Sequence, residues 1–304
     1  RGPGGVGGKV VAVAPNRVAL LPRRGWCPGR AMPQEIPGME LAGRVVAVGP
    51  RVVRWALGDR VMGIVGGGAY AERIAVHERQ LMAVPDAIEL GDAAAIPEVW
   101  ITAWDALVLQ GGLGPNGTVL VHAGGSGVGT AAIQLVKLLG GTVVVTASAA
   151  KAEACRALGA DVVVDYAGED FVEAARQATG GAGIQVVLDV IGGDYLDRNV
   201  DALATGGRIV QVGVMGGGKT QLDVAKLLPK RATIIGTVLR PRPIEEKIAV
   251  TQRFASEVLP AFADGRLHPV IDSRYPIEEI AAAHARMESN ANVGKILIDV
   301  AAEA

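Results

Sequence analysis

The stretch from Thr118 to Gly140 constrains the fold more than any other part of this sequence. A short β-branched run, Thr118 to Val121, predicts a buried strand, and a glycine-rich turn follows it. The mostly apolar residues after the turn predict a helix that ends at Gly140. Glycines in such a turn let the backbone approach a pyrophosphate, and the helix N-terminus supplies free N–H groups. The stretch is typical of the start of a dinucleotide-binding βαβ unit.

The residues that follow continue the alternation of strand and helix. Ala149 to Leu158 predicts a helix, and five further runs rich in Val, Ile and Leu predict strands: Thr142–Thr146, Val162–Val164, Ile184–Leu188, Arg208–Val212 and Arg231–Val238. Near-continuous apolar strands of this kind are typical of a parallel sheet covered on both faces. The predicted fold class is therefore α/β, with a doubly wound parallel sheet. A sheet of this kind that binds some other ligand at its switch point remains the alternative.

The N-terminal part has a different pattern. Arg1–Gly8 and Pro22–Pro37 are predicted to be irregular, and short strands are predicted at Lys9–Ala14, Leu41–Val48, Asp59–Val65, Tyr70–Val76 and Leu81–Val84. Short strands with turns between them predict a small, barrel-like β domain. Near Ile96-Pro97 the spacing of apolar residues changes from every second residue, as in a strand, to the spacing of a helix. We therefore place a nucleotide-binding domain at 97–237 and a discontinuous, β-rich substrate domain at 1–96 and 238–304.

The C-terminal part is expected to pack back onto the N-terminal β domain. Its predicted elements are a long helix over Ile244–Phe262, a short strand at Val270–Ile271, a helix over Ile277–Met287 and a strand over Lys295–Asp299.

Composition excludes several classes of protein. The chain has 304 residues and a mean hydropathy of +0.32, but no uninterrupted apolar run is long enough to span a bilayer. A net charge of −1 gives no electrostatic footprint for nucleic acid or an anionic membrane. Two cysteines, Cys27 and Cys155, exclude a disulfide framework, so a reducing cytoplasm is the expected location. The chain begins at Arg1 without a Met, and we expect its natural start to be missing.

Several separate segments resemble one known family. They are Pro37-Gly-Met-Glu-Leu-Ala-Gly43, Gly58-Asp-Arg-Val61, Gly68-Ala-Tyr-Ala-Glu72, Pro97-Glu-Val-Trp-Ile-Thr-Ala103, Ser126-Gly-Val-Gly-Thr-Ala-Ala-Ile-Gln134, Gly192-Gly-Asp-Tyr195 and Val293-Gly-Lys-Ile296. Together they resemble the medium-chain dehydrogenase/reductase superfamily, and within it the zinc-independent quinone oxidoreductases of the p53-inducible NADPH:quinone oxidoreductase type. The resemblance implies a Rossmann domain and a GroES-like β domain whose first strands are missing from this chain.

Comparison with the zinc enzymes of the same superfamily predicts that this chain has no metal site. Zinc enzymes of this superfamily carry His in a Pro-Gly-His-Glu segment, whereas this chain has Met39 there. A thioether does not replace imidazole at a zinc site. The four histidines, His77, His122, His268 and His284, are scattered without ligand spacing. No metal and no catalytic acid, base or nucleophile is therefore expected, and the protein would act by orienting the hydride donor.

The end of the second Rossmann strand favours NADPH over NADH. Sites that bind NAD usually place Asp or Glu about twenty residues after the glycines, where it contacts the ribose hydroxyls. Here that strand ends at Thr146-Ala147-Ser148 without an acid, and Lys151 follows. The resemblance implies that Ser148, Lys151 and Tyr166 hold the 2′-phosphate. The alternative is that Lys151 is an ordinary solvated helix residue.

The resemblance also implies the remaining contacts. The pyrophosphate turn would comprise Gly125, Ser126, Gly127, Val128, Gly129 and Thr130. The nicotinamide half would contact Asn16, Thr102, Ile191, Gly213, Val214, Leu239 and Asn292. The substrate pocket would include Asn16, Trp26, Cys27 and Met215, with Cys27 standing where the family often has Tyr. Structural alternatives exist for two of these residues, since Asn16 also suits a turn and Thr102 also suits helix packing.

The predicted function is NADPH-dependent reduction of a quinone, and reduction of an enone or enoyl thioester is the closest alternative. Gly213–Thr220 matches the P-loop pattern after a predicted strand, which leaves a nucleotide-hydrolysing protein as a remote alternative. A non-catalytic nucleic-acid binder is another, although the balanced charge gives it no support. Ser126 resembles part of a hydrolase elbow but lacks the second glycine, since position 128 is Val. A homodimer through the edge strand near Arg231–Val238 is also predicted.

Overall fold

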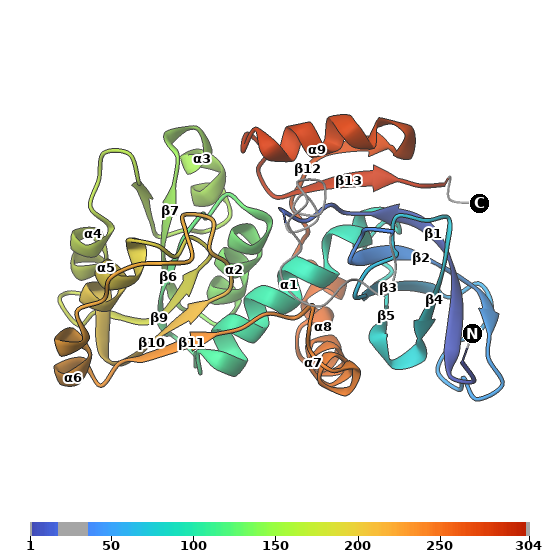
Figure 1. The fold of residues 1–304 in the computed structure, drawn as a ribbon, viewed down its shortest axis with the longest axis horizontal. Coiled ribbons are helices and arrows are strands. Elements are labelled where there is room, and N and C mark those ends of the chain that lie inside the picture. The colour runs from blue at the N-terminus through green and yellow to red at the C-terminus, as the bar shows by residue number, and fades with distance from the viewer. Residues whose placement is uncertain (1, 18–35, 302–304) are drawn as a thin grey trace. The chain divides into compact units, whose positions relative to one another are not determined.

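The computed structural model describes residues 2–17 and 36–301, and the chain forms two compact units (Figure 1). Unit 1 comprises Arg1–Ile101 and Leu239–Ala304, and unit 2 comprises Thr102–Val238. The first division falls inside helix α1 (Pro97–Trp104), a few residues after the position that the change of period suggested. The second division falls at Val238, next to the sequence-based boundary.

Unit 1 is built on one mixed sheet. Its seven strands are β1 (Gly5–Val13), β2 (Glu40–Val48), β3 (Arg60–Ile64), β4 (Arg73–His77), β5 (Leu81–Ala83), β12 (Ile271–Pro276) and β13 (Lys295–Asp299). The strand order is β12-β13-β1-β2-β3-β5, and β4 pairs with β1. Because the C-terminal strand β13 pairs with β1, the C-terminal part joins the N-terminal sheet, as predicted.

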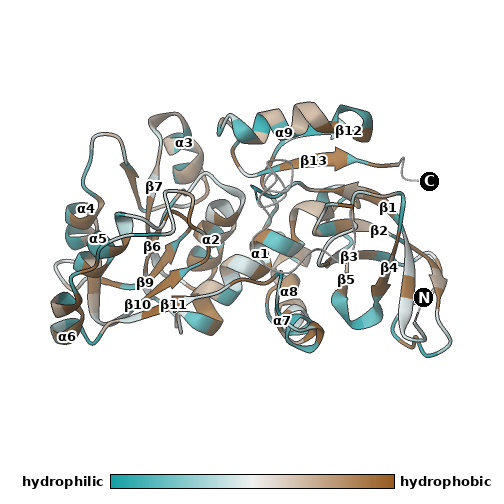
Figure 2. Ribbon diagram, viewed as in Figure 1, coloured by the Kyte–Doolittle hydropathy of each residue, from teal (hydrophilic) through white to brown (hydrophobic). Residues whose placement is uncertain are grey.

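The apolar side chains of this sheet form the core of unit 1. Figure 2 shows brown, apolar stretches along β1, β2, β3 and β13. The buried residues include Val10, Leu41, Val61 and Ile298, and Ala283 and Met287 of helix α9 (Ile280–Glu288) pack against them. Trp100 of α1 is 1 % exposed and packs edge-on against Phe262, with ring centroids 4.7 Å apart, so it is a core residue.

Unit 2 contains a parallel sheet of six strands. They are β6 (Thr118–Val121), β7 (Thr142–Ala147), β8 (Val162–Asp165), β9 (Ile184–Asp189), β10 (Leu203–Gln211) and β11 (Thr233–Gly236), in the order β11-β10-β9-β6-β7-β8. The chain runs outward from β6 to β8 and then returns to β9 on the other side of β6. The carboxyl ends of β6 and β9 therefore form the switch point, where ligands of such sheets bind. The predicted doubly wound α/β sheet is confirmed.

Helices connect the strands of unit 2. They are α2 (Gly127–Leu138), α3 (Ala149–Ala157), α4 (Phe171–Ala178), α5 (Tyr195–Ala202) and α6 (Leu227–Lys230), and a π-helical segment, Asp105–Gln110, follows α1. None of the described helices, in either unit, combines the length and apolar character needed to cross a bilayer.

Several predicted elements need correction. Residues 1–8 were expected to be irregular, but β1 begins at Gly5, because pairing with β2 and β4 outweighs the low strand propensity of glycine. The single helix expected over Ile244–Phe262 is two helices, α7 (Ile244–Glu257) and α8 (Leu259–Ala263). They meet just before Pro260, which has no N–H to continue the first helix.

Two strands lie elsewhere or are shorter than predicted. The strand expected over Tyr70–Val76 is β4 at Arg73–His77, because the Tyr70 N–H is bonded to the Pro37 carbonyl of a distant segment and not to a neighbouring strand. The edge strand expected over Arg231–Val238 spans only Thr233–Gly236 and begins after Arg231, which has a left-handed backbone (φ 47°). The predicted loop at Pro22–Pro37 lies mostly outside the described residues.

Candidate functional site

The glycine turn lies at the carboxyl end of β6 and leads directly into α2. The Ser126 hydroxyl oxygen accepts a hydrogen bond from the Gly129 N–H at 3.0 Å and so caps the helix. Within the described chain, the N–H groups of Gly127 and Val128 make no hydrogen bond to protein. Unpaired N–H groups at the start of a helix are suited to binding an anion, because the helix dipole adds partial positive charge there.

Glycine is required in this turn by close approaches of the chain. A Cβ atom on Gly129 would overlap the carbonyl oxygen of Ala123 and lie 2.6 Å from that of Gly124. A Cβ atom on Gly125 would lie 2.6 Å from Cδ of Lys151. The turn is therefore bare backbone, with the Lys151 stem lying against Gly125. This arrangement fits a diphosphate that contacts main-chain N–H groups.

The residues predicted to hold a 2′-phosphate gather near the end of β7. Ser148 is half-buried and precedes α3 without capping it, and its hydroxyl has no capping partner. The Tyr166 N–H donates to the Ala147 carbonyl at 3.2 Å, which brings Tyr166 beside Ser148. Lys151 extends from α3 toward the glycine turn. The structure thus brings these three residues together with the turn, and none of them is acidic.

The loops after β9 and β10 pair with each other at the same end of the sheet. The Ile191 carbonyl accepts from the Gly216 N–H at 2.7 Å, and the Val190 carbonyl accepts from the Met215 N–H at 3.1 Å. Val214 and Met215 are about half exposed, at 51 % and 50 %. Four predicted residues, Ile191, Gly213, Val214 and Met215, therefore lie together in unit 2.

A buried polar network supports the β6, β7 and β9 ends. His122 is fully buried, with Nδ1 3.0 Å from the Thr146 hydroxyl and Nε2 2.7 Å from Oδ1 of Asn199. Asn199 Nδ2 donates to Asp189 Oδ2 at 2.9 Å. The other oxygen of Asp189 accepts from the N–H groups of Ile191 and Gly192, at 2.6 and 3.0 Å. The network therefore links the residue just before the glycine turn to the loop after β9.

The state of His122 follows from this geometry. The Asn199 amide directs its NH₂ to Asp189, so its oxygen faces His122 and Nε2 carries the hydrogen. Nδ1 then accepts from the Thr146 hydroxyl. Burial lowers the pKa of His122, with Asp189 opposing that shift, so the imidazole is neutral in the folded protein. The rings of Phe171 and Tyr195 pack edge-on against it at 4.9 and 4.7 Å.

Unit 1 holds three of the remaining predicted residues, Asn16, Leu239 and Asn292. Asn16 is 8 % exposed and donates from Nδ2 to Glu40 Oε1 at 2.8 Å. Leu239 and Asn292 are buried, and Asn292 donates to the Gly294 carbonyl at 2.9 Å. Thr102, half-buried in α1, belongs to unit 2. Trp26 and Cys27 lie outside the described residues.

Met39 takes the position where zinc enzymes of the superfamily have His. It is 7 % exposed and lies directly before β2. Over residues 2–17 and 36–301, no group of three or more His, Cys, Asp or Glu side chains is placed to hold a metal ion.

The structure does not give the segment Gly213–Thr220 the conformation that a P-loop needs. After β10, the segment Gly213–Thr220 pairs with the loop at Ile191–Gly193 instead of wrapping a helix N-terminus. Lys219 and Thr220 are exposed and no helix begins at them; the next turn of helix is Val224–Lys226. A Walker lysine needs the helix that follows directly. Ser126 likewise caps α2 and is not presented as a nucleophile.

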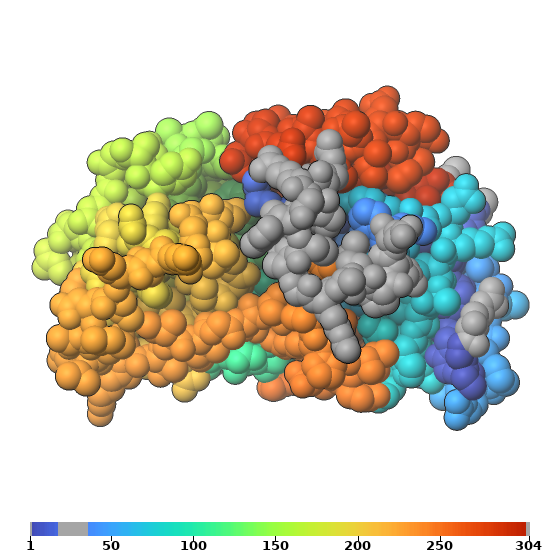
Figure 3. Space-filling view, viewed as in Figure 1, coloured from blue at the N-terminus to red at the C-terminus, as the bar shows by residue number. Residues whose placement is uncertain are grey.

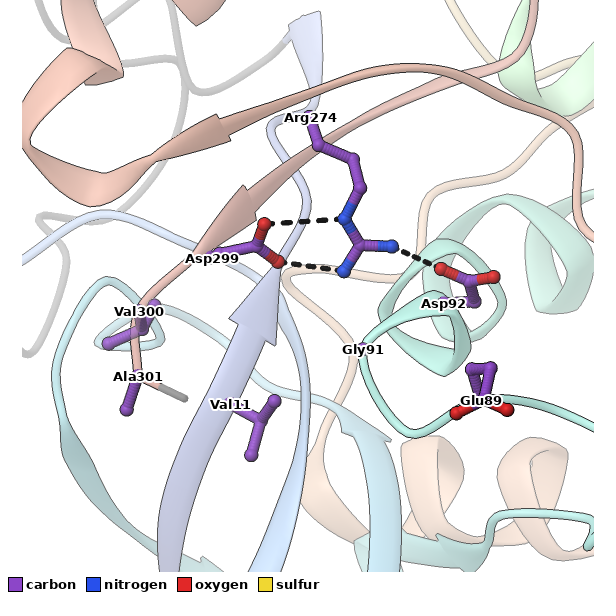
Figure 4. A pocket seen from close by; sticks show the side chains of 8 residues that line it. All are labelled: Val11, Glu89, Gly91, Asp92, Arg274, Asp299, Val300 and Ala301. Atoms are coloured by element: carbon purple, nitrogen blue, oxygen red, sulfur yellow. Dashed lines mark hydrogen bonds and ion pairs between the residues drawn. The ribbon is translucent and has the colours of Figure 1, made fainter. Parts of the chain in front are cut away.

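A separate cavity of about 660 Å³ lies in unit 1 (Figure 4). Arg274 crosses it and binds Asp299, with an N–O distance of 2.7 Å, and Asp92. Glu89, Val11 and Ala301 line the rest. None of the predicted site residues that the structure describes lines this cavity, and its Arg is already paired with two carboxylates. We assign it no role in the chemistry.

The sequence analysis assigned no site role to five buried polar residues that contact predicted site residues of the same unit, directly or through one another. They are Glu40, His122, Asp189, Asn199 and Lys295. Each lies at 9 % exposure or less, which is unusual for such residue types unless they are paired. The available signal was their position at strand ends: Glu40 and Lys295 begin β2 and β13, and Asp189 ends β9.

A β unit made from both ends of the chain, joined to a Rossmann sheet with a glycine turn at its switch point, defines a two-domain oxidoreductase. Family models agree: the alcohol dehydrogenase GroES-like domain matches residues 2–86, and the family described as zinc-binding dehydrogenase matches residues 127–256.

Curated relatives cover the chain to different extents. The synaptic vesicle membrane protein VAT-1 homolog of Rattus norvegicus is 32 % identical over 98 % of this chain and 77 % of its own length. The polyketide synthase GfsB of Streptomyces halstedii is 46 % identical over 41 % of this chain, but the match spans only 2 % of that synthase. The chain belongs to the medium-chain dehydrogenase/reductase superfamily of oxidoreductases.

Solved structures agree in fold. An NAD-dependent alcohol dehydrogenase matches with a TM-score of 0.87 and 32 % identity, covering 99 % of this chain and 93 % of that one. The quinone oxidoreductase of Escherichia coli in complex with NADPH matches with a TM-score of 0.86 and 28 % identity, covering 98 % of this chain and 92 % of that one. The JamJ enoyl reductase matches with a TM-score of 0.86 and 25 % identity, covering 97 % of this chain and 91 % of that one.

Proposed function

We propose that this protein is an NADPH-dependent quinone oxidoreductase that needs no metal, of the p53-inducible type named by the sequence resemblance. The observation that carries the proposal is the end of β7, where the chain continues with Ser148 and not with an acidic residue, and where the Lys151 stem lies against Gly125 of the glycine turn. The similarity to the E. coli quinone oxidoreductase, whose structure contains NADPH, supports it. Bound NADPH supplies the hydride, and a proton from solvent completes the hydroquinone.

The chain's own residues would bind NADPH and orient it toward the acceptor. The N–H groups of Gly127 and Val128 would contact the pyrophosphate, and Lys151 with Ser148 and Tyr166 would contact the 2′-phosphate. The paired loops at Ile191 and Gly213–Met215, with Thr102, Asn16, Leu239 and Asn292, would hold the nicotinamide half. Met215, Asn16, Trp26 and Cys27 would line the acceptor pocket. A quinone suits a site without a Lewis acid, because its reduced form is an aromatic, stabilised oxyanion.

Reduction of an enone or an enoyl thioester is the second candidate. It is favoured by the 46 % identity to a polyketide synthase segment and by the similarity to the JamJ enoyl reductase. Both reactions use the same delivery of hydride, so the residues above would serve either. The expected location is still the cytoplasm, on the basis of the two cysteines.

A turnover assay tests the function, with NADPH or NADH, a panel of quinones and an enoyl thioester. We expect Lys151→Ala to weaken NADPH binding by about 10- to 100-fold and to leave NADH almost unchanged, because one charge-assisted contact to phosphate is lost. The matched control is Lys219→Ala, which removes the lysine of the P-loop-like segment. Equal losses for both cofactors would refute the assignment of Lys151. Turnover with the thioester alone would move the function to enoyl reduction.

We also propose a homodimer that pairs through β11. Among the described strands, β11 lies at the edge of the sheet and pairs with β10 alone, and its Ile234 is 37 % exposed. Figure 3 shows the orange segment that includes α6 and β11 at the surface of unit 2. An open edge with an exposed apolar residue is usually covered.

We expect light scattering to give twice the chain mass, and Ile234→Lys to give the monomer, since a charge cannot be buried there unpaired. Val53→Lys is the matched control, because Val53 is 88 % exposed in unit 1. A wild-type protein that is monomeric at micromolar concentration would exclude this interface.

A further inference from the structure

Three polar side chains from distant parts of the chain meet inside unit 1. Lys295, at the start of β13, is 5 % exposed, Glu40, at the start of β2, is 0 % exposed, and Asn16 is 8 % exposed. Lys295 Nζ lies 2.8 Å from Glu40 Oε1 and 2.8 Å from Asn16 Oδ1. Asn16 Nδ2 lies 2.8 Å from the same Glu40 oxygen. We call these residues the Asn16–Glu40–Lys295 cluster.

The cluster is fully hydrogen-bonded. The third N–H of the Lys295 ammonium donates to the Pro15 carbonyl at 3.0 Å, so no donor remains for a ligand. Glu40 Oε2 accepts from the Glu98 N–H at 2.8 Å, at the start of α1. The two charges therefore compensate each other inside the unit and do not act as free electrostatic groups.

The cluster fixes the orientation of the Asn16 amide. Its oxygen faces an ammonium and its NH₂ faces a carboxylate. A flipped amide would put NH₂ against the ammonium and oxygen against the carboxylate, and both contacts would be repulsive. Lys295 also holds the backbone of Pro15, so the segment at Pro15–Asn16 has one arrangement of backbone and side chain.

Packing alone does not require such a cluster. A buried ion pair is weak evidence for stability, since apolar residues of similar volume usually stabilise a core as well. The pair instead gives a defined geometry to the one residue among the three that the proposed function assigns to the nicotinamide and the acceptor. We propose that Lys295 and Glu40 are positioning residues for hydride transfer, which act on the reaction by holding Asn16. This inference rests on the proposed function.

The test is a double-mutant cycle in turnover. Lys295→Met keeps the length of the side chain and removes its donors, and Asn16→Ala removes the residue that Lys295 would hold. We expect Lys295→Met to lower kcat by about 10- to 100-fold in the native background, as small misplacements in a hydride-transfer geometry do. In the Asn16→Ala background it should change kcat by less than about threefold, because the positioned residue is already gone. Within each background, Lys295→Met should change NADPH affinity by less than about threefold, whereas Asn16→Ala itself removes a proposed contact to the nicotinamide half.

Two further readouts separate positioning from folding. The loss of Tm caused by Lys295→Met should be similar in both backgrounds, whereas the loss of kcat should not. The deuterium isotope effect with 4-deuterated NADPH should rise in Lys295→Met, because hydride transfer becomes slower relative to other steps. If Lys295→Met does not fold, Glu40→Gln, which keeps the shape of the side chain, replaces it in the same cycle.

The outcomes are distinguishable. Equal, independent losses of kcat in both backgrounds, or a loss of Tm with unchanged kcat and isotope effect, would overturn the positioning role. If the wild type turns over neither a quinone nor an enoyl thioester with NADPH, the proposed function fails instead. Recovery of part of kcat in Lys295→Arg, which keeps the charge and the donors, would support the inference.

Discussion

Gly129→Ala is expected to raise the dissociation constant for NADPH at least about 100-fold. The new Cβ would overlap the Ala123 carbonyl oxygen and lie 2.6 Å from that of Gly124. Both atoms are backbone, so the turn itself has to move, and the N–H groups of Gly127 and Val128 move with it. Alanine favours a helix by about 1 kcal/mol relative to glycine, but that gain does not offset an overlap of backbone atoms. Fluorescence titration with NADPH measures the effect.

A graded series of glycine substitutions provides the controls. Gly114→Ala should leave NADPH affinity unchanged, because its new Cβ would meet no atom of the described chain within 4 Å beyond its own chain neighbours. Gly125→Ala should have a smaller effect than Gly129→Ala, since its Cβ meets the flexible stem of Lys151 and not backbone. Unchanged NADPH affinity in Gly129→Ala, with the protein folded, would show that this turn is not the cofactor site.

The turn was predictable because its determinants are contiguous. The run Thr118–Val121 predicted both ends of β6, whereas α2 begins at Gly127, inside the predicted glycine turn, because the Ser126 hydroxyl caps it there. Each step depends on neighbours within about twenty residues, where strand period, capping and glycine flexibility act. The same applies to β13 at Lys295–Asp299, whose apolar run is bounded by Gly294 and whose two ends agree with the prediction.

The polar clusters were not predictable for the opposite reason. Asn16 and Lys295 are 279 residues apart, and His122 and Asn199 are 77 apart. No hydrophobic period relates such positions, and pairing of β1 with β13 and of β6 with β9 decides which side chains meet. The sequence analysis noted His122 only for its lack of metal-ligand spacing, and its partners Asp189 and Asn199 became visible only with the strand order.

Asp189→Leu is expected to lower the free energy of unfolding by about 3–5 kcal/mol, because three hydrogen-bond donors lose their acceptor at once. The substitution leaves the N–H groups of Ile191 and Gly192 and the Asn199 amide without their acceptor. Each buried donor without an acceptor costs about 1–3 kcal/mol. Urea denaturation measures the loss. A change below about 1 kcal/mol would contradict the network.

Asp189→Asn is the matched variant, and we expect it to cost only about 1–2 kcal/mol. Its oxygen can still accept from Ile191 and Gly192, while its NH₂ would oppose that of Asn199. The conflict is relieved if the Asn199 amide flips, so that its NH₂ donates to Nε2 of His122. The imidazole hydrogen then sits on Nδ1, which donates it to the Thr146 hydroxyl. Nitrogen-15 NMR of histidine would report this change of tautomer, and an unchanged Nε2–H form would refute it.

The pH dependence of stability tests the same network. Burial lowers the pKa of His122 in the folded protein, so between that value and the unfolded value of about 6.5 only the unfolded chain binds the proton. Stability should therefore fall as the pH drops below about 6.5, with a contribution of up to about 1.4 kcal/mol per pH unit, and His122 should contribute no slope above it. In Asp189→Asn this window should extend to lower pH, because the carboxylate charge that raises the pKa of His122 is gone. A wild-type slope that His122→Gln leaves unchanged would assign the acid sensitivity to other groups.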